Sequence, residues 1–105
     1  MNKYELRTNK KKEAIIHSAL ELFSTNGFQN TSIKQISDKA QVSQVSIYNY
    51  FGSKDALVTE CAKIIMKNTL ESAKQILQEP IPFIEKINKA LSLFTGEIHK
   101  VFFVL

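Results

Sequence analysis

Apolar residues recur with a helical period along almost the whole chain. Across residues 10–26 they fall at Ile15, Ala19, Leu22 and Phe23, which is the i, i+4, i+7, i+8 spacing of a helix that buries one side. No segment shows the alternation of apolar and polar residues, bounded by turn residues, that marks paired strands. The pattern therefore predicts an all-α fold.

Turn and capping residues divide this pattern into five helices. Gly27 ends the first helix, because glycine readily adopts the left-handed backbone found at helix C-termini. Ser32 and Gln35 form the residue pattern of a capping box at the start of the second helix. Ser43 and Ser53 are suited to cap the third and fourth helices. The predicted helices cover residues 10–26, 32–40, 43–51, 53–78 and 82 onward.

The fifth predicted helix follows two prolines, which cannot continue the helix before it. Its apolar residues keep one phase, at Phe83, Ile87, Ala90, Leu91, Phe94, Ile98 and Phe102. The chain then ends on five consecutive apolar residues, 101–105. A solvated terminus rarely carries such a patch, so we expect this chain to be part of a longer helical protein.

The composition is that of an ordinary folded domain. Of the 105 residues, 44% are hydrophobic and 23% are charged, which excludes an intrinsically disordered chain. No apolar run approaches the roughly 20 residues of a membrane-spanning helix, and we expect no membrane partner. The single cysteine, Cys61, cannot form an internal disulfide, which favours the reducing cytoplasm.

The net charge of +4 comes mainly from the N-terminus. Five basic residues among the first twelve face one acidic residue, Glu5. Such a segment is a common electrostatic handle for phosphate backbones, and an ordinary solvated terminus has the same composition. We therefore treat residues 1–9 as a basic N-terminal arm that precedes the first helix.

Residues 31–54 have the layout of a helix-turn-helix motif, in which two short helices are joined by a turn of three or four residues. In such motifs the second helix enters the major groove of DNA. On a helical wheel Ile47 and Phe51 of this helix fall on the core side. The opposite side carries no charged residue and is formed by Gln44, Val45, Ser46, Tyr48 and Asn49.

These side chains are suited to the edges of base pairs. A glutamine or asparagine amide pairs with adenine N6 and N7, and an apolar group contacts the thymine methyl. Lys34 and Lys54 lie at the edges of this side, where phosphates would lie. The alternative is a helical protein-interaction module that uses Val45 and Tyr48 as apolar contacts. Salt dependence distinguishes the two, because contacts to phosphates weaken steeply as salt rises.

The same stretch resembles the DNA-binding domain of TetR-family transcriptional regulators. The resemblance covers about residues 10–60 and includes the run Ile47-Tyr48-Asn49-Tyr50-Phe51-Gly52-Ser53-Lys54. It implies a three-helix DNA-binding domain at 10–54, with the helix-turn-helix at about 33–52. Two longer helices in residues 55–105 would begin a ligand-binding and dimerisation domain. The residues it places on DNA are Thr31, Ser32, Lys34, Ser43, Gln44, Val45, Ser46, Tyr48, Asn49, Tyr50 and Lys54.

The resemblance also implies partners. A homodimer would bind a roughly palindromic operator in double-stranded DNA, usually as a repressor, and a small-molecule effector would release it. Two positions depart from the family pattern. Gln41 stands where a glycine often forms the turn, and a left-handed backbone there costs on the order of 1 kcal/mol. Val45 stands where a glycine often permits close approach, and it either shifts the docking or selects a thymine methyl.

No residue pattern supports an enzyme. His17 and His99 have no second ligand at a metal-binding spacing. Cys61 lies on an apolar helix face, as a small buried hydrophobe does. The sequence contains no glycine-rich phosphate loop and no nucleophile elbow. The phenylalanines of the fifth predicted helix either line an effector pocket or belong to the core. We expect no cofactor and no metal.

Overall fold

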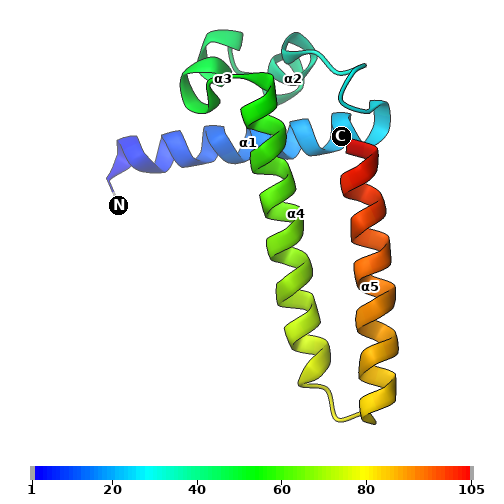
Figure 1. The fold of residues 1–105 in the computed structure, drawn as a ribbon. Helices are drawn as coiled ribbons and strands as arrows, with labels where there is room; N and C mark the ends of the chain where they lie inside the picture. The colour runs from blue at the N-terminus through cyan, green and yellow to red at the C-terminus, as the bar shows by residue number, and fades with distance from the viewer. Residues whose placement is uncertain (1, 105) are drawn as a thin grey trace.

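The computed structural model describes the backbone of residues 2–104 and the side chains of residues 2–96. The described residues form five helices and no strand, namely α1 (Lys3–Asn26), α2 (Ile33–Ala40), α3 (Gln44–Phe51), α4 (Lys54–Leu77) and α5 (Phe83–Val104). In Figure 1, α1 runs across the molecule, α2 and α3 lie on one side of it, and α4 and α5 form an antiparallel pair that extends to the other. The predicted all-α fold, with a three-helix domain followed by two longer helices, is confirmed.

Serine caps begin three of the helices at the predicted residues. The Oγ of Ser32 accepts a hydrogen bond from the Gln35 backbone N–H at 3.1 Å, and the Ser32 N–H donates to Gln35 Oε1 at 2.8 Å, which completes the capping box. Ser43 and Ser53 cap α3 and α4 in the same way, each accepting at 3.0 Å from the N–H three residues later. Each such cap stabilises a helix by about 1 kcal/mol.

The first helix begins earlier than the apolar pattern indicates. The pattern predicts a start near Lys10 after an arm over residues 1–9, whereas α1 begins at Lys3. The side chain of Asn2 caps it by accepting from the Glu5 backbone N–H at 2.8 Å. The added turns bury no side chain, so the hydrophobic periodicity gives no sign of them. The basic N-terminal segment is therefore helical, because of its cap and its helix-favouring residues.

The core lies where α1, α2, α3 and α4 meet. Its buried apolar residues are Ile15, Ala19, Phe23, Ile33, Ile36, Ile47, Leu57, Val58 and Cys61. Phe28 folds back on the end of α1, and its ring centroid lies 6.0 Å from that of Phe23. α2 and α3 have only eight residues each, too few for stable helices in isolation. Burial of their isoleucines against α1 and α4 therefore holds the two short helices in place.

α4 and α5 extend away from the three-helix domain as a long antiparallel pair (Figure 1). The predicted apolar stripe of α5 is only partly buried. Phe83 and Leu91 are exposed, and the other described members are half-buried. The predicted positions Ile98 and Phe102, and the apolar segment 101–105, lie outside the described side chains. No helix in the described part of the chain has the length and hydrophobicity needed to cross a membrane.

Candidate nucleic-acid interface

The turn of residues 41–43 joins α2 to α3. Gln41 has a left-handed backbone, with φ of 59° and ψ of 44°, and within residues 2–104 it is the one non-glycine residue with positive φ. The backbone N–H groups of Gln41 and Val42 both donate to the Ser37 carbonyl oxygen, the second at 3.1 Å. These bonds end α2 as a Schellman-type cap does. The turn thus keeps a left-handed backbone although Gln41 replaces the usual glycine, and it carries the strain of a side chain in this region.

α3 buries one side and exposes the other. Ile47 is 1% exposed, and Tyr50 and Phe51 pack against the core as half-buried residues. On the outer side Val45 is 66% exposed and Tyr48 is 48% exposed. We call the outer side of α3 the reading face, which is formed by Gln44, Val45, Ser46, Tyr48 and Asn49. The helical-wheel assignment away from the core is confirmed by the exposure of Gln44, Val45, Tyr48 and Asn49, whereas Ser46 is half-buried.

The serines at the start of α3 bond to each other. The Oγ atoms of Ser43 and Ser46 lie 2.9 Å apart, and Ser43 Oγ also accepts from the Ser46 backbone N–H. Because one hydroxyl donates to the other, one hydroxyl proton of the pair remains for an outside partner. At the start of α2, Ser32 and Lys34 are exposed. All four predicted contact residues therefore have solvent-accessible surface at the helix-turn-helix.

Thr31 does not belong to this surface, although the family pattern predicts it there. It is 1% exposed. Its hydroxyl lies 2.9 Å from the Gly27 carbonyl oxygen and 3.2 Å from that of Leu22, so it donates one shared hydrogen bond to the end of α1. A buried hydroxyl with these partners cannot reach DNA. The prediction for Thr31 is corrected to a structural role at the end of α1.

Lys54 is half-buried and makes an internal contact. Its Nζ donates to the Phe28 carbonyl oxygen at 2.6 Å and lies 4.1 Å from the centroid of the Phe28 ring. The ammonium thus joins the start of α4 to the loop after α1, through a hydrogen bond and a cation–π contact. Two of its three protons remain for another acceptor. The phosphate contact predicted for Lys54 stays a prediction.

Two further contacts involving α1 were not expected from the sequence. Lys12 Nζ lies 5.7 Å from the centroid of the Tyr50 ring, which brings a cation from α1 to the end of α3. Lys39 of α2 forms an ion pair with Glu21 of α1 at 2.9 Å. The Lys39 ammonium lowers the pKa of the Glu21 carboxyl, by a hydrogen bond and by its charge. No local pattern could reveal these contacts, because the partners are far apart in the sequence.

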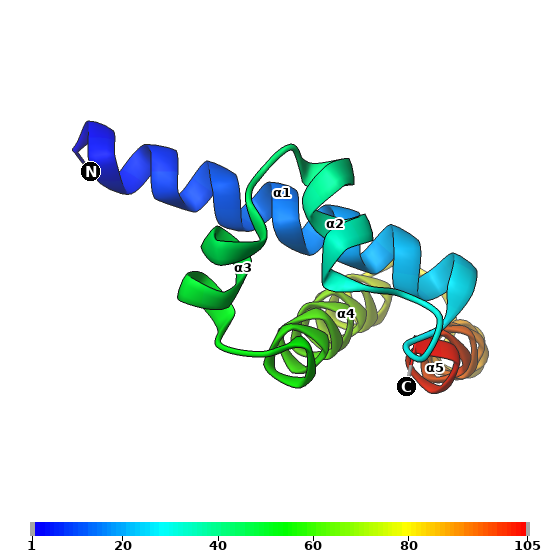
Figure 2. The same ribbon diagram turned by 90° about the horizontal axis from the view of Figure 1, so that it is seen from above.

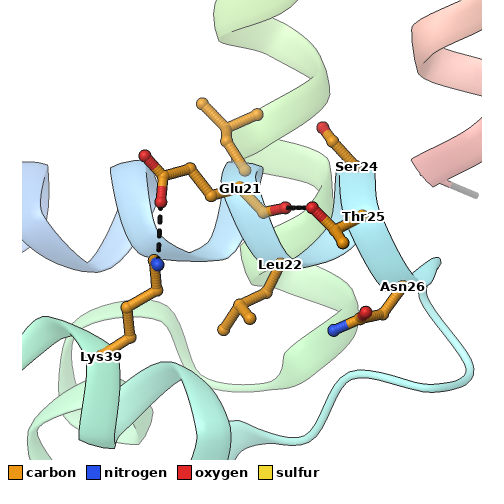
Figure 3. A pocket seen from close by; sticks show the side chains of 7 residues that line it. Glu21, Leu22, Ser24, Thr25, Asn26 and Lys39 are labelled. Atoms are coloured by element: carbon orange, nitrogen blue, oxygen red, sulfur yellow. Dashed lines mark hydrogen bonds and ion pairs between the residues drawn. The ribbon is translucent and has the colours of Figure 1, made fainter.

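The Glu21–Lys39 ion pair borders an open pocket at the end of α1 (Figure 3). The residues that line it are Leu20, Glu21, Leu22, Ser24, Thr25, Asn26 and Lys39. Figure 3 shows the Thr25 hydroxyl beside this pocket. Its Oγ1 donates to the Glu21 carbonyl oxygen at 2.9 Å, so its hydrogen bond is made within α1. The pocket lies away from the reading face, and none of the predicted DNA-contacting residues lines it.

The described residues do not gather a set of metal ligands. Cys61 is fully buried, and burial, with a smaller contribution from the charge of Glu60, raises the pKa of its thiol to about 12. The thiol therefore stays protonated and packs as a small hydrophobe. No three His, Cys, Asp or Glu side chains of the described part come together as metal ligands. His99 lies outside the residues whose side chains the structure describes.

The short helices, their turn and the exposed reading face define a helix-turn-helix protein. Residues 15–61 match the family model described as bacterial regulatory proteins, tetR family. The fold is similar to a TetR-like transcriptional regulator from Rhodococcus sp. RHA1, with a TM-score of 0.72 and 28% identity over 90% of this chain and 54% of that one. It is also similar to a transcriptional regulator (TerR/AcrR family) from Aquifex aeolicus VF5, with a TM-score of 0.66 and 28% identity over 90% of this chain and 53% of that one.

The curated relatives are HTH-type transcriptional regulators. The HTH-type transcriptional regulator UidR of Escherichia coli (strain K12) is 31% identical over 88 residues, which are 84% of this chain and 43% of UidR. The uncharacterized HTH-type transcriptional regulator YvdT of Bacillus subtilis (strain 168) is 37% identical over 68 residues, 65% of this chain and 35% of YvdT. The chain thus spans less than half the length of these relatives. Its residues 15–61 thus form a DNA-binding domain of the TetR family of transcriptional regulators.

Proposed function

We propose that this chain is the DNA-binding part of a transcriptional regulator, and that α3 enters the major groove of a specific operator. The observation that carries the proposal is the exposed and uncharged reading face of α3. A helix face that only meets solvent is usually rich in lysine and glutamate. Here Val45 is 66% exposed and Tyr48 48% exposed between side-chain amides. Such groups match the donors, acceptors and methyl groups of base pairs.

Each side chain of the interface has a role that follows from its chemistry. The amides of Gln44 and Asn49 pair with adenine, and Val45 packs on a thymine methyl. Lys34 donates to a base or a phosphate. Residues at the helix ends bind phosphates, together with the backbone N–H groups of the N-termini of α2 and α3. The proposed DNA-contacting residues are Ser32, Lys34, Ser43, Gln44, Val45, Ser46, Tyr48, Asn49, Tyr50 and Lys54.

Membership of the TetR family supports the finer proposals. The protein acts in the cytoplasm as a homodimer, on an operator whose two half-sites are related by a two-fold axis. It represses transcription, and a small-molecule effector releases it from DNA. The effector binds among the helices that follow the three-helix domain. α4 belongs to both regions, because Leu57 and Cys61 pack in the core while its later turns lie beside α5.

Selection of bound duplexes from a random pool tests the proposal. We expect the chain to enrich one sequence that contains A·T pairs at the positions read by the amides and by Val45. If that sequence contains a two-fold repeat, the chain binds DNA as a dimer. Binding should weaken steeply as salt rises, because neutralised phosphates release counterions. A failure to enrich any sequence, or affinity for DNA that does not depend on salt, contradicts the proposal. Salt-insensitive capture of a protein on Val45 and Tyr48 favours the alternative interaction module instead.

Two substitutions separate specificity from affinity. Gln44→Ala should change the base preference in the selection, because base contacts specify sequence and phosphate contacts do not. Gln75→Ala removes the same amide from an exposed position on α4 and is the matched control. Tyr48→Ala should weaken operator binding without lowering the melting temperature, because Tyr48 lies outside the core. Unchanged affinity for Tyr48→Ala together with unchanged preference for Gln44→Ala contradicts the assigned face.

A further inference from the structure

The first turns of α1 form an extension of the three-helix domain. Figure 2 shows α1 projecting on the N-terminal side past the turns against which α2 and α4 pack. We call residues 3–12 the α1 extension. Its side chains are exposed except for those of Thr8 and Lys12, which are half-buried. Ten residues of α-helix are about 15 Å long, so the extension widens the molecule beside the helix-turn-helix.

The α1 extension accounts for the net positive charge of the chain. It contains five basic residues and one acidic residue, Glu5, so its formal charge of +4 equals that of the whole chain. Lys3, Arg7 and Lys10 follow one another at i, i+4 and i+7, which puts the three cations on one line along the helix. Like charges at this spacing repel and weaken a helix, so this line does not stabilise the fold.

These cations have no acidic partner within the described residues. The ion pairs of the described chain involve His17, Lys39, Lys63 and Lys89. None of them includes a residue of the α1 extension. The cationic line of Lys3, Arg7 and Lys10 is therefore available to an outside anion.

The location of the extension beside the helix-turn-helix favours DNA as its partner, as it does for the reading face. Glu21 lies eleven residues after Lys10, which is close to three full helical turns. Glu21 is therefore on the same side of α1 as Lys10 and the rest of the cationic line. Glu21 forms an ion pair with Lys39 at the end of α2. The cationic line therefore lies on the side of α1 that faces α2. On another side, Lys12 reaches the ring of Tyr50 at the end of α3. One cation of the extension, Lys12, thus borders α3, and the cationic line lies on the side of α1 that faces α2.

We propose that the α1 extension binds the phosphate backbone of the DNA that flanks the half-site read by α3. The proposal rests on the proposed function, because it requires α3 to be seated in the groove. At 3.4 Å per base pair, a helix about 15 Å long lies along about four base pairs. Contacts from lysine and arginine to phosphates add affinity and fix the position of the protein, but they carry no sequence information.

The pattern of the extension does not suit a lipid surface. An interfacial helix needs a continuous apolar side opposite its charges. The two large apolar residues of the extension are Tyr4 and Leu6. Two residues are 200° apart on a helix, so these side chains point in nearly opposite directions. Tyr4, which is 77% exposed, instead offers a phenol that can donate to a phosphate.

The test uses the operator obtained by selection with the chain, in two lengths. One duplex ends at the last base pair of the half-site, and the other continues for six base pairs. The variant Lys3→Gln/Arg7→Gln/Lys10→Gln removes the cationic line and keeps helix-favouring side chains. The matched control Lys67→Gln/Lys74→Gln/Lys86→Gln removes three lysines from α4 and α5. Circular dichroism checks that both variants keep the helix content of the parent.

We expect the parent and the control to bind the long duplex on the order of tenfold or more tightly than the short one. The triple variant should bind both duplexes equally, and its salt slope on the long duplex should fall by about one for each lost phosphate contact. The base preference should be the same for all three proteins. Equal binding of the long duplex by variant and parent overturns the α1 extension as a DNA contact and leaves the role of α3 intact. An equal loss by the variant on both duplexes also overturns it. If the parent selects no sequence, the proposed function and this proposal fail together.

Discussion

Replacing Gln41 with glycine tests whether the turn of the helix-turn-helix is strained. Gln41 has φ of 59°, whereas the other residues with positive φ in the described chain are Gly27 and Gly52. A side chain in the left-handed region costs about 1–2 kcal/mol, because Cβ crowds the next carbonyl oxygen. Glycine avoids this cost but loses about 0.5–1 kcal/mol more backbone entropy on folding. We expect Gln41→Gly to raise the free energy of unfolding by about 0.5–1 kcal/mol.

Urea unfolding followed by circular dichroism measures this change as a higher midpoint at an unchanged slope. For a domain of this size, 1 kcal/mol corresponds to a rise in melting temperature of about 4–8 °C. Gln41→Ala is the matched control, because it keeps Cβ and removes the rest of an exposed side chain. Its stability should stay within about 0.5 kcal/mol of the parent. Gln41→Asn should fall between alanine and glycine, because asparagine tolerates the left-handed region.

The comparison between the glycine and alanine variants decides the question. If Gln41→Gly is no more stable than Gln41→Ala, the backbone of the turn is not strained and the reasoning is refuted. Gln41 is not among the proposed DNA contacts. The operator affinity of the glycine variant, measured well below its unfolding temperature, should therefore equal that of the parent, which separates strain in the turn from DNA recognition.

Three other predictions follow from buried or paired groups. Thr31→Val removes the hydroxyl that bonds the end of α1 and should lower the free energy of unfolding by about 1–3 kcal/mol, whereas Thr31→Ser should recover most of it. Urea midpoints measure both, and a parent-like valine variant contradicts the structural role. Cys61 should react with iodoacetamide at pH 8 only as fast as the chain unfolds, because its thiol is buried and its pKa is about 12; rapid labelling of the folded chain contradicts this. Glu21 has a lowered pKa, so its contribution to stability is present above pH 4.5 and is lost as the pH falls through the folded pKa. In a pH series of urea midpoints Glu21→Gln should therefore lose less stability in acid than the parent, and parallel curves contradict the ion pair with Lys39.

The sequence by itself determined the number of helices, the starts of α2, α3 and α4, and the exposed side of α3. Ser32, Ser43 and Ser53 cap the predicted helices, because a cap needs only a side chain and an N–H three residues away. The burial of Ile47 and the exposure of Val45 follow from the helical period. These features depend on neighbours in the chain, so local patterns contain them. The DNA contacts proposed for this side of α3 remain predictions.

Only the tertiary structure decided which polar side chains are already engaged. Thr31 is buried under the end of α1, and Lys54 is held by Phe28 from the loop after α1. The Glu21–Lys39 ion pair joins two helices. Each of these contacts forms between residues that the chain brings together by folding the short helices back on α1. Their spacing in sequence has no period, so no local pattern can separate a lysine or threonine that meets solvent from one that meets the protein.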